Sequence, residues 1–189
     1  MWALVENNQV SKVYTRPKAI TIGDVSYPQN IFMLWSSDEL EAIGIYEVVV
    51  DNSNFKNPSY YINTNQSFDF ANDVVTASYG TATPKSLDDV TDEDGNVTRG
   101  LKYNHKQVIN QQAGGMLSNT DWYVIREADG GTACPEDIST HRAAIRTKAN
   151  EMCTLIDGAA DVDALAALYE YNDAEPPVRP LGEFPSLDV

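Results

Sequence analysis

"PEDISTHRAAIRTKANEMCTLIDG", residues 135–158, is the segment that decides the fold class. A proline at its start, two acids in the next turn and a glycine at its end are typical of a helix over about 135–157. The apolar residues recur on one helical face, which is made of Ile138, Ile145, Ala149, Met152 and Ile156. A second helix, starting at Asp161 and carrying Leu165 on its own stripe, follows closely. We therefore expect these two helices to form an antiparallel hairpin.

Upstream of this segment, LKYNHKQVINQQ (101–112) predicts another helix, ending near Gly114 and Gly115. Residues 101–175 thus read as a helical domain. Residues 176–189 form a proline-rich tail, which we expect to be extended and ordered only by packing onto another element.

The first part of the chain, residues 1–80, is rich in strand patterns. Apolar and polar residues alternate on both sides of Asn7-Asn8 and of Gly23-Asp24, which predicts two hairpins. Ser36 and Glu39 have the spacing of a capping box and predict a short helix. Further strands are expected at IYEVVV, YYINT, SFDFA and VVTASY. The predicted fold class is α+β: a small antiparallel β-domain, then a helical region with an antiparallel helix hairpin.

Residues 81–100 separate the two regions and are strongly acidic. They predict a linker or an exposed hairpin with Asp94-Gly95 at its tip. The run of acids at 88–96 also raises the possibility of bound calcium. The spacing does not fit an EF-hand loop, because with Asp92 as the first position the glycine is fourth rather than sixth and the twelfth residue is Tyr103. A solvated turn is the preferred interpretation.

The overall charge limits the choice of partners. Thirteen basic residues face 28 acidic ones, giving a formal net charge of −15. Such a chain is repelled by nucleic acid and by anionic membranes, so neither is expected as a partner. The opening MWALVENNQV lacks the pattern of an export signal, and no stretch is long and apolar enough for a membrane span.

No group of residues has the spacing of a catalytic, metal or cofactor site. Cys134 and Cys153 form no Cys-x-x-Cys motif, and His105 and His141 have no second metal ligand at helical spacing. We therefore expect no enzyme activity, no metal and no cofactor. Arg142 and Arg146 lie four residues apart and could bind an anion or a partner's carboxylates, although an exposed helical flank is the preferred interpretation.

Aromatic residues are plentiful, with ten tyrosines, three tryptophans and five phenylalanines. Many fall in the β-rich part, where they could fill a core or form a surface that recognises sugars or proteins. Core filling is preferred. The residues concerned are Tyr46, Tyr60, Tyr61, Phe68, Phe70 and Tyr79.

One motif of the helical region also bears on function. A helix ending in AGGML is followed by TDWYVIREADGG and then by a helix with Arg-Ala-Ala-x-Arg. This order resembles the C-terminal region of proteins of tailed-bacteriophage tail-fibre modules, the tail-fibre assembly or tail assembly chaperone proteins. The resemblance covers about residues 105–170 and is carried by Leu117, Asp121, Trp122, Arg142, Ala143 and Arg146. The opening MWALVENNQV resembles the N-terminal hairpin of the same group, and VRPLGEFP is similar to marine phage tail proteins.

The chain departs from this group in two ways. Assembly chaperones are often little more than a flexible part and the helical region, whereas here about half of the chain reads as an ordered β-domain. The arginine-bearing helix is also longer than theirs.

Within TDWYVIREADGG we expect Asp121 to cap backbone donors at a turn and Trp122 to fill the seam between helices. Val124 and Ile125 should then form a short extended segment before a turn at Gly130-Gly131.

The resemblance implies a structural component of a virion tail, such as a baseplate or tail-fibre adaptor. Such a protein would be made and assembled in the host cytoplasm. It would act through contacts with other tail or fibre proteins. Two alternatives stay open: a non-virion assembly chaperone and a receptor- or glycan-binding module. A homo-oligomer is expected. The resemblance favours a trimer, because fibre-associated proteins are commonly trimeric, and Ala149 between Ile145 and Met152 allows helices to approach closely around an axis. The residues expected as interface or packing anchors are Leu117, Asp121, Trp122, Tyr123, Arg142, Ile145, Arg146, Ala149, Met152, Ile156 and Leu165.

Overall fold

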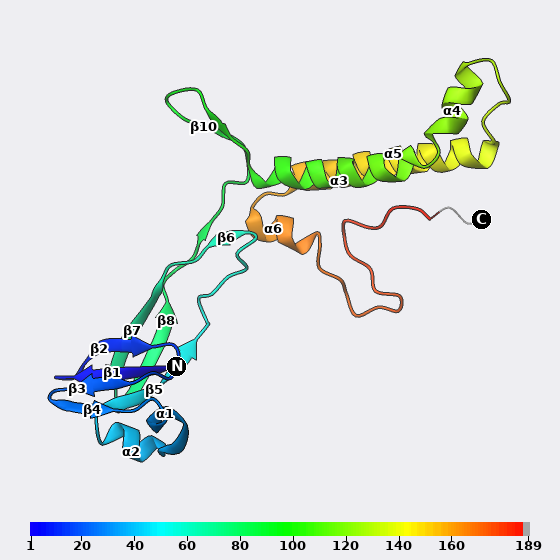
Figure 1. The fold of residues 1–189 in the computed structure, drawn as a ribbon. Coiled ribbons are helices and arrows are strands. Elements are labelled where there is room, and N and C mark those ends of the chain that lie inside the picture. Colours follow the sequence, from blue (N-terminus) through cyan, green and yellow to red (C-terminus); the bar gives the residue numbers. More distant parts are fainter. Residues whose placement is uncertain (187–189) are drawn as a thin grey trace. The chain divides into compact units, whose positions relative to one another are not determined.

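The structure is a computed structural model that describes residues 1–186. Contacts divide the chain into two compact units, Met1–Thr83 and a second that begins at Pro84. The first is built on an antiparallel-rich sheet and the second is helical (Figure 1), so the predicted α+β class is confirmed. The acidic segment, expected between two domains, belongs from Pro84 onward to the helical unit.

The first unit is organised by a five-stranded sheet of order β2-β1-β5-β8-β7. Its strands are β1 (Trp2–Glu6), β2 (Gln9–Tyr14), β5 (Ile45–Asp51), β7 (Gln66–Ala71) and β8 (Val74–Tyr79). All neighbouring strands are antiparallel except β5 and β8, which pair in parallel with Val48 opposite Val75. The edge strands β2 and β7 contact each other, so the sheet is curled.

Tight turns set the register of the hairpins. Asn7 and Asn8 join β1 to β2, and Asn72 and Asp73 join β7 to β8, all four with positive φ. Two consecutive left-handed residues match the twist of a two-residue hairpin, and Asn and Asp tolerate this conformation. The predicted hairpin of β3 (Ile20–Ile22) and β4 (Val25–Tyr27) is also confirmed.

The core of this unit lies between the first strands and two short helices, α1 (Ile31–Leu34) and α2 (Ser37–Glu41). The capping box of Ser36 and Glu39 is present. Phe32 packs against Trp2 and Tyr14, with ring centroids 4.9 and 5.8 Å away. The buried members are Leu4, Tyr14, Ile20, Ile31, Phe32, Leu40 and Ile45.

The aromatic residues that we weighed as core or recognition surface are neither fully buried nor fully exposed. Tyr46 packs on Phe70 with ring centroids 4.7 Å apart, and Phe55 packs on Tyr79 at 4.9 Å. The pairing favours the packing role for these rings. Two-residue strands, β6 (Tyr61–Ile62) and β9 (Thr83–Pro84), complete this part of the chain.

The second unit contains a short hairpin and four helices. The hairpin is formed by β10 (Val90–Thr91) and β11 (Val97–Thr98), with Gly95 in the left-handed region at the predicted tip. The helices are α3 (Leu101–Ser118), α4 (Asp121–Ala128), α5 (Glu136–Gly158) and α6 (Val162–Ala167). None of the helices within residues 1–186 is long and apolar enough to cross a membrane.

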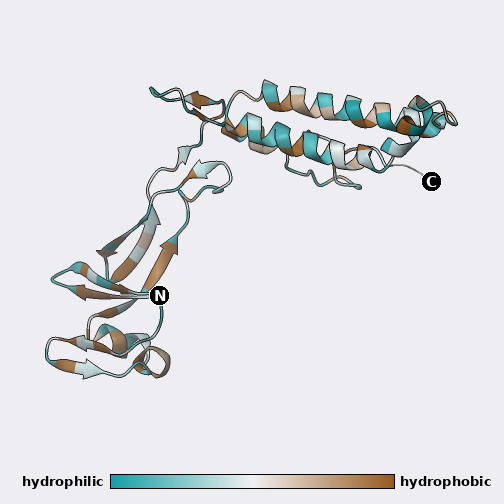
Figure 2. Ribbon diagram, turned by 45° about the horizontal axis from the view of Figure 1, so that its top comes forward, coloured by the Kyte–Doolittle hydropathy of each residue, from teal (hydrophilic) through white to brown (hydrophobic). Residues whose placement is uncertain are grey.

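The antiparallel helix hairpin is made by α3 and α5, which lie side by side (Figure 1). We expected α5 to pair with the following helix, but α6 has only six residues. The predicted end of α3 near Gly114-Gly115 is also wrong, because the helix continues to Ser118. Each glycine costs about 1 kcal/mol in a helix interior, and packing of the buried Ile109 and Ala113 offsets this cost. Figure 2 shows hydrophobic and hydrophilic residues alternating along both long helices.

The expected apolar stripe of α5 is confirmed, because Ile138, Ile145, Ala149, Met152 and Ile156 are all buried. The proline-rich tail packs against the helical unit. Leu181 is buried and its N–H donates to the carbonyl of Leu168 at 2.9 Å. The last three residues of the tail, 187–189, lie outside the described residues.

The start of α3 is capped by backbone from the acidic segment. The N–H groups of Leu101 and Lys102 donate to the carbonyls of Ser86 and Leu87, and the N–H of Gly100 donates to the Asp89 carboxylate at 2.8 Å. That hydrogen bond, followed by one from Arg99, lowers the pKa of Asp89. A Cβ at position 100 would lie 2.4 Å from the backbone carbon of Asp88, so the close approach requires glycine.

We predict that Gly100→Ala destabilises the protein by about 2 kcal/mol, because the added methyl group meets backbone that cannot move aside freely. Gly114→Ala is the matched control: its Cβ meets nothing within 4 Å, and the change should stabilise α3 by about 1 kcal/mol. Urea unfolding followed by circular dichroism measures both. Equal effects of the two variants would contradict the capping role of segment 86–89.

Candidate functional site: the Arg142 corner and helix α4

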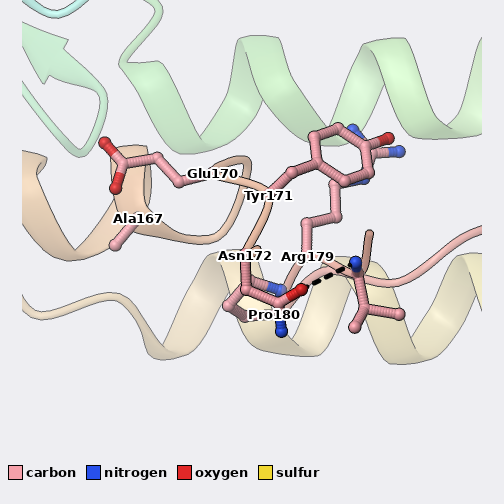
Figure 3. A pocket seen from close by; sticks show the side chains of 7 residues that line it. Ala167, Glu170, Tyr171, Asn172, Arg179 and Pro180 are labelled. Atoms are coloured by element: carbon pink, nitrogen blue, oxygen red, sulfur yellow. Dashed lines mark hydrogen bonds between the residues drawn. The ribbon is translucent and has the colours of Figure 1, made fainter. Parts of the chain in front are cut away.

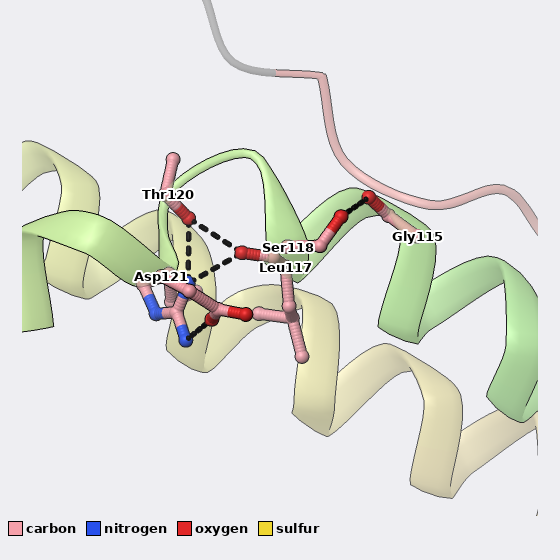
Figure 4. Close-up of polar contacts among 6 residues, drawn as sticks. Gly115, Leu117, Ser118, Thr120 and Asp121 are labelled. Carbon is pink, nitrogen blue, oxygen red and sulfur yellow. Dashed lines mark hydrogen bonds and ion pairs between the residues drawn. The ribbon is translucent and has the colours of Figure 1, made fainter. Parts of the chain in front are cut away.

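The buried side chain of Arg142 organises one end of the helix hairpin. One guanidinium nitrogen donates to the Leu117 carbonyl and to the Thr120 hydroxyl, both at 2.6 Å. The other terminal nitrogen donates to the Asp121 carboxylate at 2.7 Å. Figure 4 shows these contacts around the end of α3 and the start of α4. We call Leu117, Thr120, Asp121 and Arg142 the Arg142 corner.

The Arg142 corner supplies hydrogen-bond donors to backbone carbonyls at the end of α3, where the helix itself provides none. The carbonyl of Leu117 also accepts from the Thr120 hydroxyl and backbone, and Ser118 donates to the Gly115 carbonyl at 2.8 Å. Only Asn119 and Thr120 separate α3 from α4. The planar guanidinium, with donors in fixed directions, therefore joins α3, α4 and α5 at one point.

A second arginine, Arg126, forms hydrogen bonds with the loop that follows the C-terminal end of α4. Arg126 donates to the carbonyls of Thr132 and Ala133 at 3.0 and 3.1 Å. The N–H of Gly131 donates back to the Arg126 carbonyl at 2.9 Å, and Gly130 has the left-handed φ of the predicted turn. Arg126 thus fixes the loop between α4 and α5.

Helix α4 itself is held away from any core. None of its eight residues is buried by the part of the chain that the structure describes. Trp122, Val124 and Ile125 are 51%, 42% and 59% exposed. An isolated helix of this length is marginal in water, so its order depends on the contacts at its two ends.

The structure corrects four expectations for this segment. Trp122 does not fill a seam: it lies in the first turn of α4 and stacks on Tyr123, with ring centroids 3.8 Å apart. Val124 and Ile125 are helical rather than extended. Arg142, expected on an exposed flank, is 6% exposed.

Asp121, expected to cap backbone donors at the turn, accepts instead from the guanidinium of Arg142. That guanidinium contacts residues on both sides of the turn and takes the buried position in which Trp122 was expected.

The other expected anchors divide into two groups. Arg146 is exposed on α5, one turn beyond Arg142. Ile145, Ala149, Met152, Ile156 and Leu165 are buried within the chain. They act as packing anchors, and a face that is covered in this way is closed to a second copy.

His105, which we expected to have no metal-binding role, lies in a partly buried contact with Tyr169. Its Nδ1 is 2.7 Å from the Tyr169 hydroxyl, and burial lowers the pKa of the imidazole. His141 is partly exposed on α5. Within residues 1–186 no three side chains of His, Cys, Asp or Glu are grouped in a way that could hold a metal ion.

In the acidic hairpin, the carboxylate of Asp92 accepts hydrogen bonds from other residues of the turn. Asp92 accepts from the backbone of Asp94 and Asn96 and from the Asn96 side chain, with the contacts to Asn96 at 2.8 and 3.0 Å. These hydrogen bonds, those from Asn96 first, lower the pKa of Asp92. The observed contacts match the preferred interpretation of a solvated turn.

A shallow hollow lies where α6 meets the tail (Figure 3). Several of its polar groups already have partners: Asn172 accepts from the N–H of Val178 at 3.0 Å, and Arg179 pairs with Glu183 at 2.7 Å. Tyr171 also donates to Glu183. The hollow therefore reads as the place where the tail is attached rather than as a ligand site.

Comparison with known proteins gives no further guidance: no protein-family model, curated protein or solved structure matches the chain. The Arg142 corner and the exposed helix that it holds are thus the site that the structure itself offers. Sequence reasoning selected Leu117, Asp121 and Arg142 but missed Thr120 and Arg126. The threonine directly before Asp121 was the available signal for Thr120.

We predict that Arg142→Ala destabilises the helical unit by about 2 kcal/mol, because it leaves the Leu117 carbonyl and the Thr120 hydroxyl without their buried donor. Amide hydrogen exchange should show loss of protection across residues 119–128. Arg146→Ala, on the exposed side of α5, is the matched control and should change stability by less than about 0.5 kcal/mol. Unchanged exchange in α4 of the Arg142 variant would contradict this role.

The contact of His105 predicts a pH dependence. Because burial lowers its folded-state pKa, the unfolded state binds the proton more readily. Stability should therefore be full above the unfolded value of about 6.5 and should decline as the pH falls through and below it. The free energy of unfolding, measured between pH 8 and pH 5, should decline less in His105→Gln than in the wild type. Parallel curves would show that His105 does not contribute.

Proposed function

We propose that the chain is a structural component of a bacteriophage tail, in the baseplate or at the attachment of a tail fibre. In this role it acts through contacts with other tail or fibre proteins and needs no enzyme activity or cofactor. It would be made and assembled in the host cytoplasm and remain in the virion.

One observation carries the proposal. Three of the six residues that carry the tail-protein resemblance, Leu117, Asp121 and Arg142, meet in the same corner. A further one, Trp122, lies in the first turn of the helix that the corner holds exposed. A buried arginine that positions an uncovered aromatic helix fits a protein whose task is to contact another protein.

The two alternatives differ in what they require. A non-virion assembly chaperone could use the same exposed helix, but only in a transient complex. A glycan-binding module would use aromatic faces of the β-rich unit, and there the rings of Tyr46 and Phe70 already pack on each other. A virion component is therefore preferred.

The expected trimer needs a different interface from the one first considered. The face of α5 around Ala149 is covered within the chain. A homo-oligomer remains part of the proposal, formed through surface that is exposed in the single chain.

Quantitative mass spectrometry of purified, salt-washed phage particles tests this function. We expect the chain at a fixed low copy number relative to the major tail protein, in a multiple of three or six that reflects tail symmetry. Absence from particles that infect normally would overturn the proposal and favour the chaperone. The major tail protein in the same sample serves as the internal standard.

A further inference from the structure

We propose that α4 is the docking element of the chain and that its apolar face enters an apolar groove on another tail protein whose rim carries lysine and arginine. This inference rests on the proposed function and adds to it the site and the chemistry of the partner surface.

The apolar side chains of α4 gather on one side of the helix and are uncovered. At 100° per residue, Val124, Ala128, Ile125 and Trp122 fall within an arc of about 160°, which is interrupted only at the first residue of the helix, Asp121. In an ordinary surface helix such a face packs on the core, but none of these side chains is buried by residues 1–186. Trp122, Val124 and Ile125 together leave roughly 300 Å² of surface exposed, which is comparable to the largest apolar patch of a typical monomer, and such patches are often functional.

The aromatic residues of α4 are held in a fixed arrangement by Arg126. The guanidinium of Arg126 lies 4.9 Å from the Trp122 ring and 5.3 Å from the Tyr123 ring. Its donors are already used by the carbonyls of Thr132 and Ala133, so the stack is held in place before any partner arrives. Tryptophan, tyrosine and arginine are the residues that most often dominate binding energy at interfaces, and rigid anchors lose little entropy on binding.

The acidic residues around α4 indicate that the rim of the partner groove is positively charged. Between Asn119 and Thr140 the only basic residue is Arg126, whereas Asp121, Glu127, Asp129, Glu136 and Asp137 are acidic. All five acidic residues are exposed, but the Asp121 carboxylate already pairs with Arg142 at 2.7 Å. The other four carry the negative charge around α4. Two copies of this surface would repel each other, and a rim of lysine and arginine would complement it. The exposed area of α4 is below that of a complete interface, so the acidic residues around it supply the remaining contact.

Photocrosslinking in the full-length chain tests the inference. A benzophenone amino acid replaces Ile125 in one variant and Val108, an exposed apolar residue of α3, in the control. The chains are expressed in infected host cells, and crosslinked peptides are identified by mass spectrometry. We expect position 125 to link to a peptide of another tail protein that has apolar residues flanked by lysine or arginine, and position 108 not to reach that peptide.

Substitutions provide the second measurement. Trp122→Ala, Ile125→Ser and the double charge reversal Glu127→Lys with Asp129→Lys should each lower the copy number per particle about tenfold or more. Val108→Ser should leave it unchanged. Because the altered side chains are exposed or only partly buried, circular dichroism of each purified variant should match the wild type.

The outcomes separate the two proposals. If the wild-type chain is in particles and the α4 variants keep its copy number, the docking site is overturned and the function stands. If the chain is absent from particles but position 125 links to a tail protein in infected cells, the function is overturned and the docking site stands. Links from position 125 to a second copy of the chain, or to an acidic peptide, would overturn the assigned partner chemistry.

Discussion

The buried guanidinium of Arg142 is the interaction on which the helical unit depends. Taking an arginine out of water is unfavourable unless its donors are satisfied, and here a carbonyl, a hydroxyl and a carboxylate satisfy them. The three acceptors lie at the end of α3, in the turn after it and at the start of α4, whereas the arginine comes from α5. The guanidinium of Arg142 therefore determines where α3 and α5 meet and in which direction α4 runs.

An apolar side chain at this position could fill the same volume but could not direct α4. A guanidinium presents donors in one plane and fixes the orientation of its acceptors, whereas apolar packing is largely non-directional. The role of Arg142 is thus specificity of geometry more than stability. The buried apolar residues of α5, from Ile138 to Ile156, supply the stability of the pair.

Local patterns in the sequence predicted much of the fold. The stripe of α5, the capping box at Ser36 and the turn at Asn7-Asn8 depend on neighbours within a few residues, and all three are present. The errors fall where a distant contact overrides the usual preference of a residue. Tryptophan is usually buried and arginine usually exposed, so Trp122 and Arg142 were expected in each other's environments. Only the contact between α5 and the turn after α3 reverses them.

The parallel pairing of β5 with β8 could not be predicted in the same way, because no local signal states which strands become neighbours across a loop. It also separates the two units in their folding kinetics. The pairing of Val48 with Val75 joins residues 27 positions apart (75 minus 48), whereas the hydrogen bonds inside α3 and α5 join residues about four apart. Non-local pairing delays folding, and local helical contacts form quickly. The sheet should therefore form after the individual helices, with its strand edges open to misassociation while α3 and α5 are already helical.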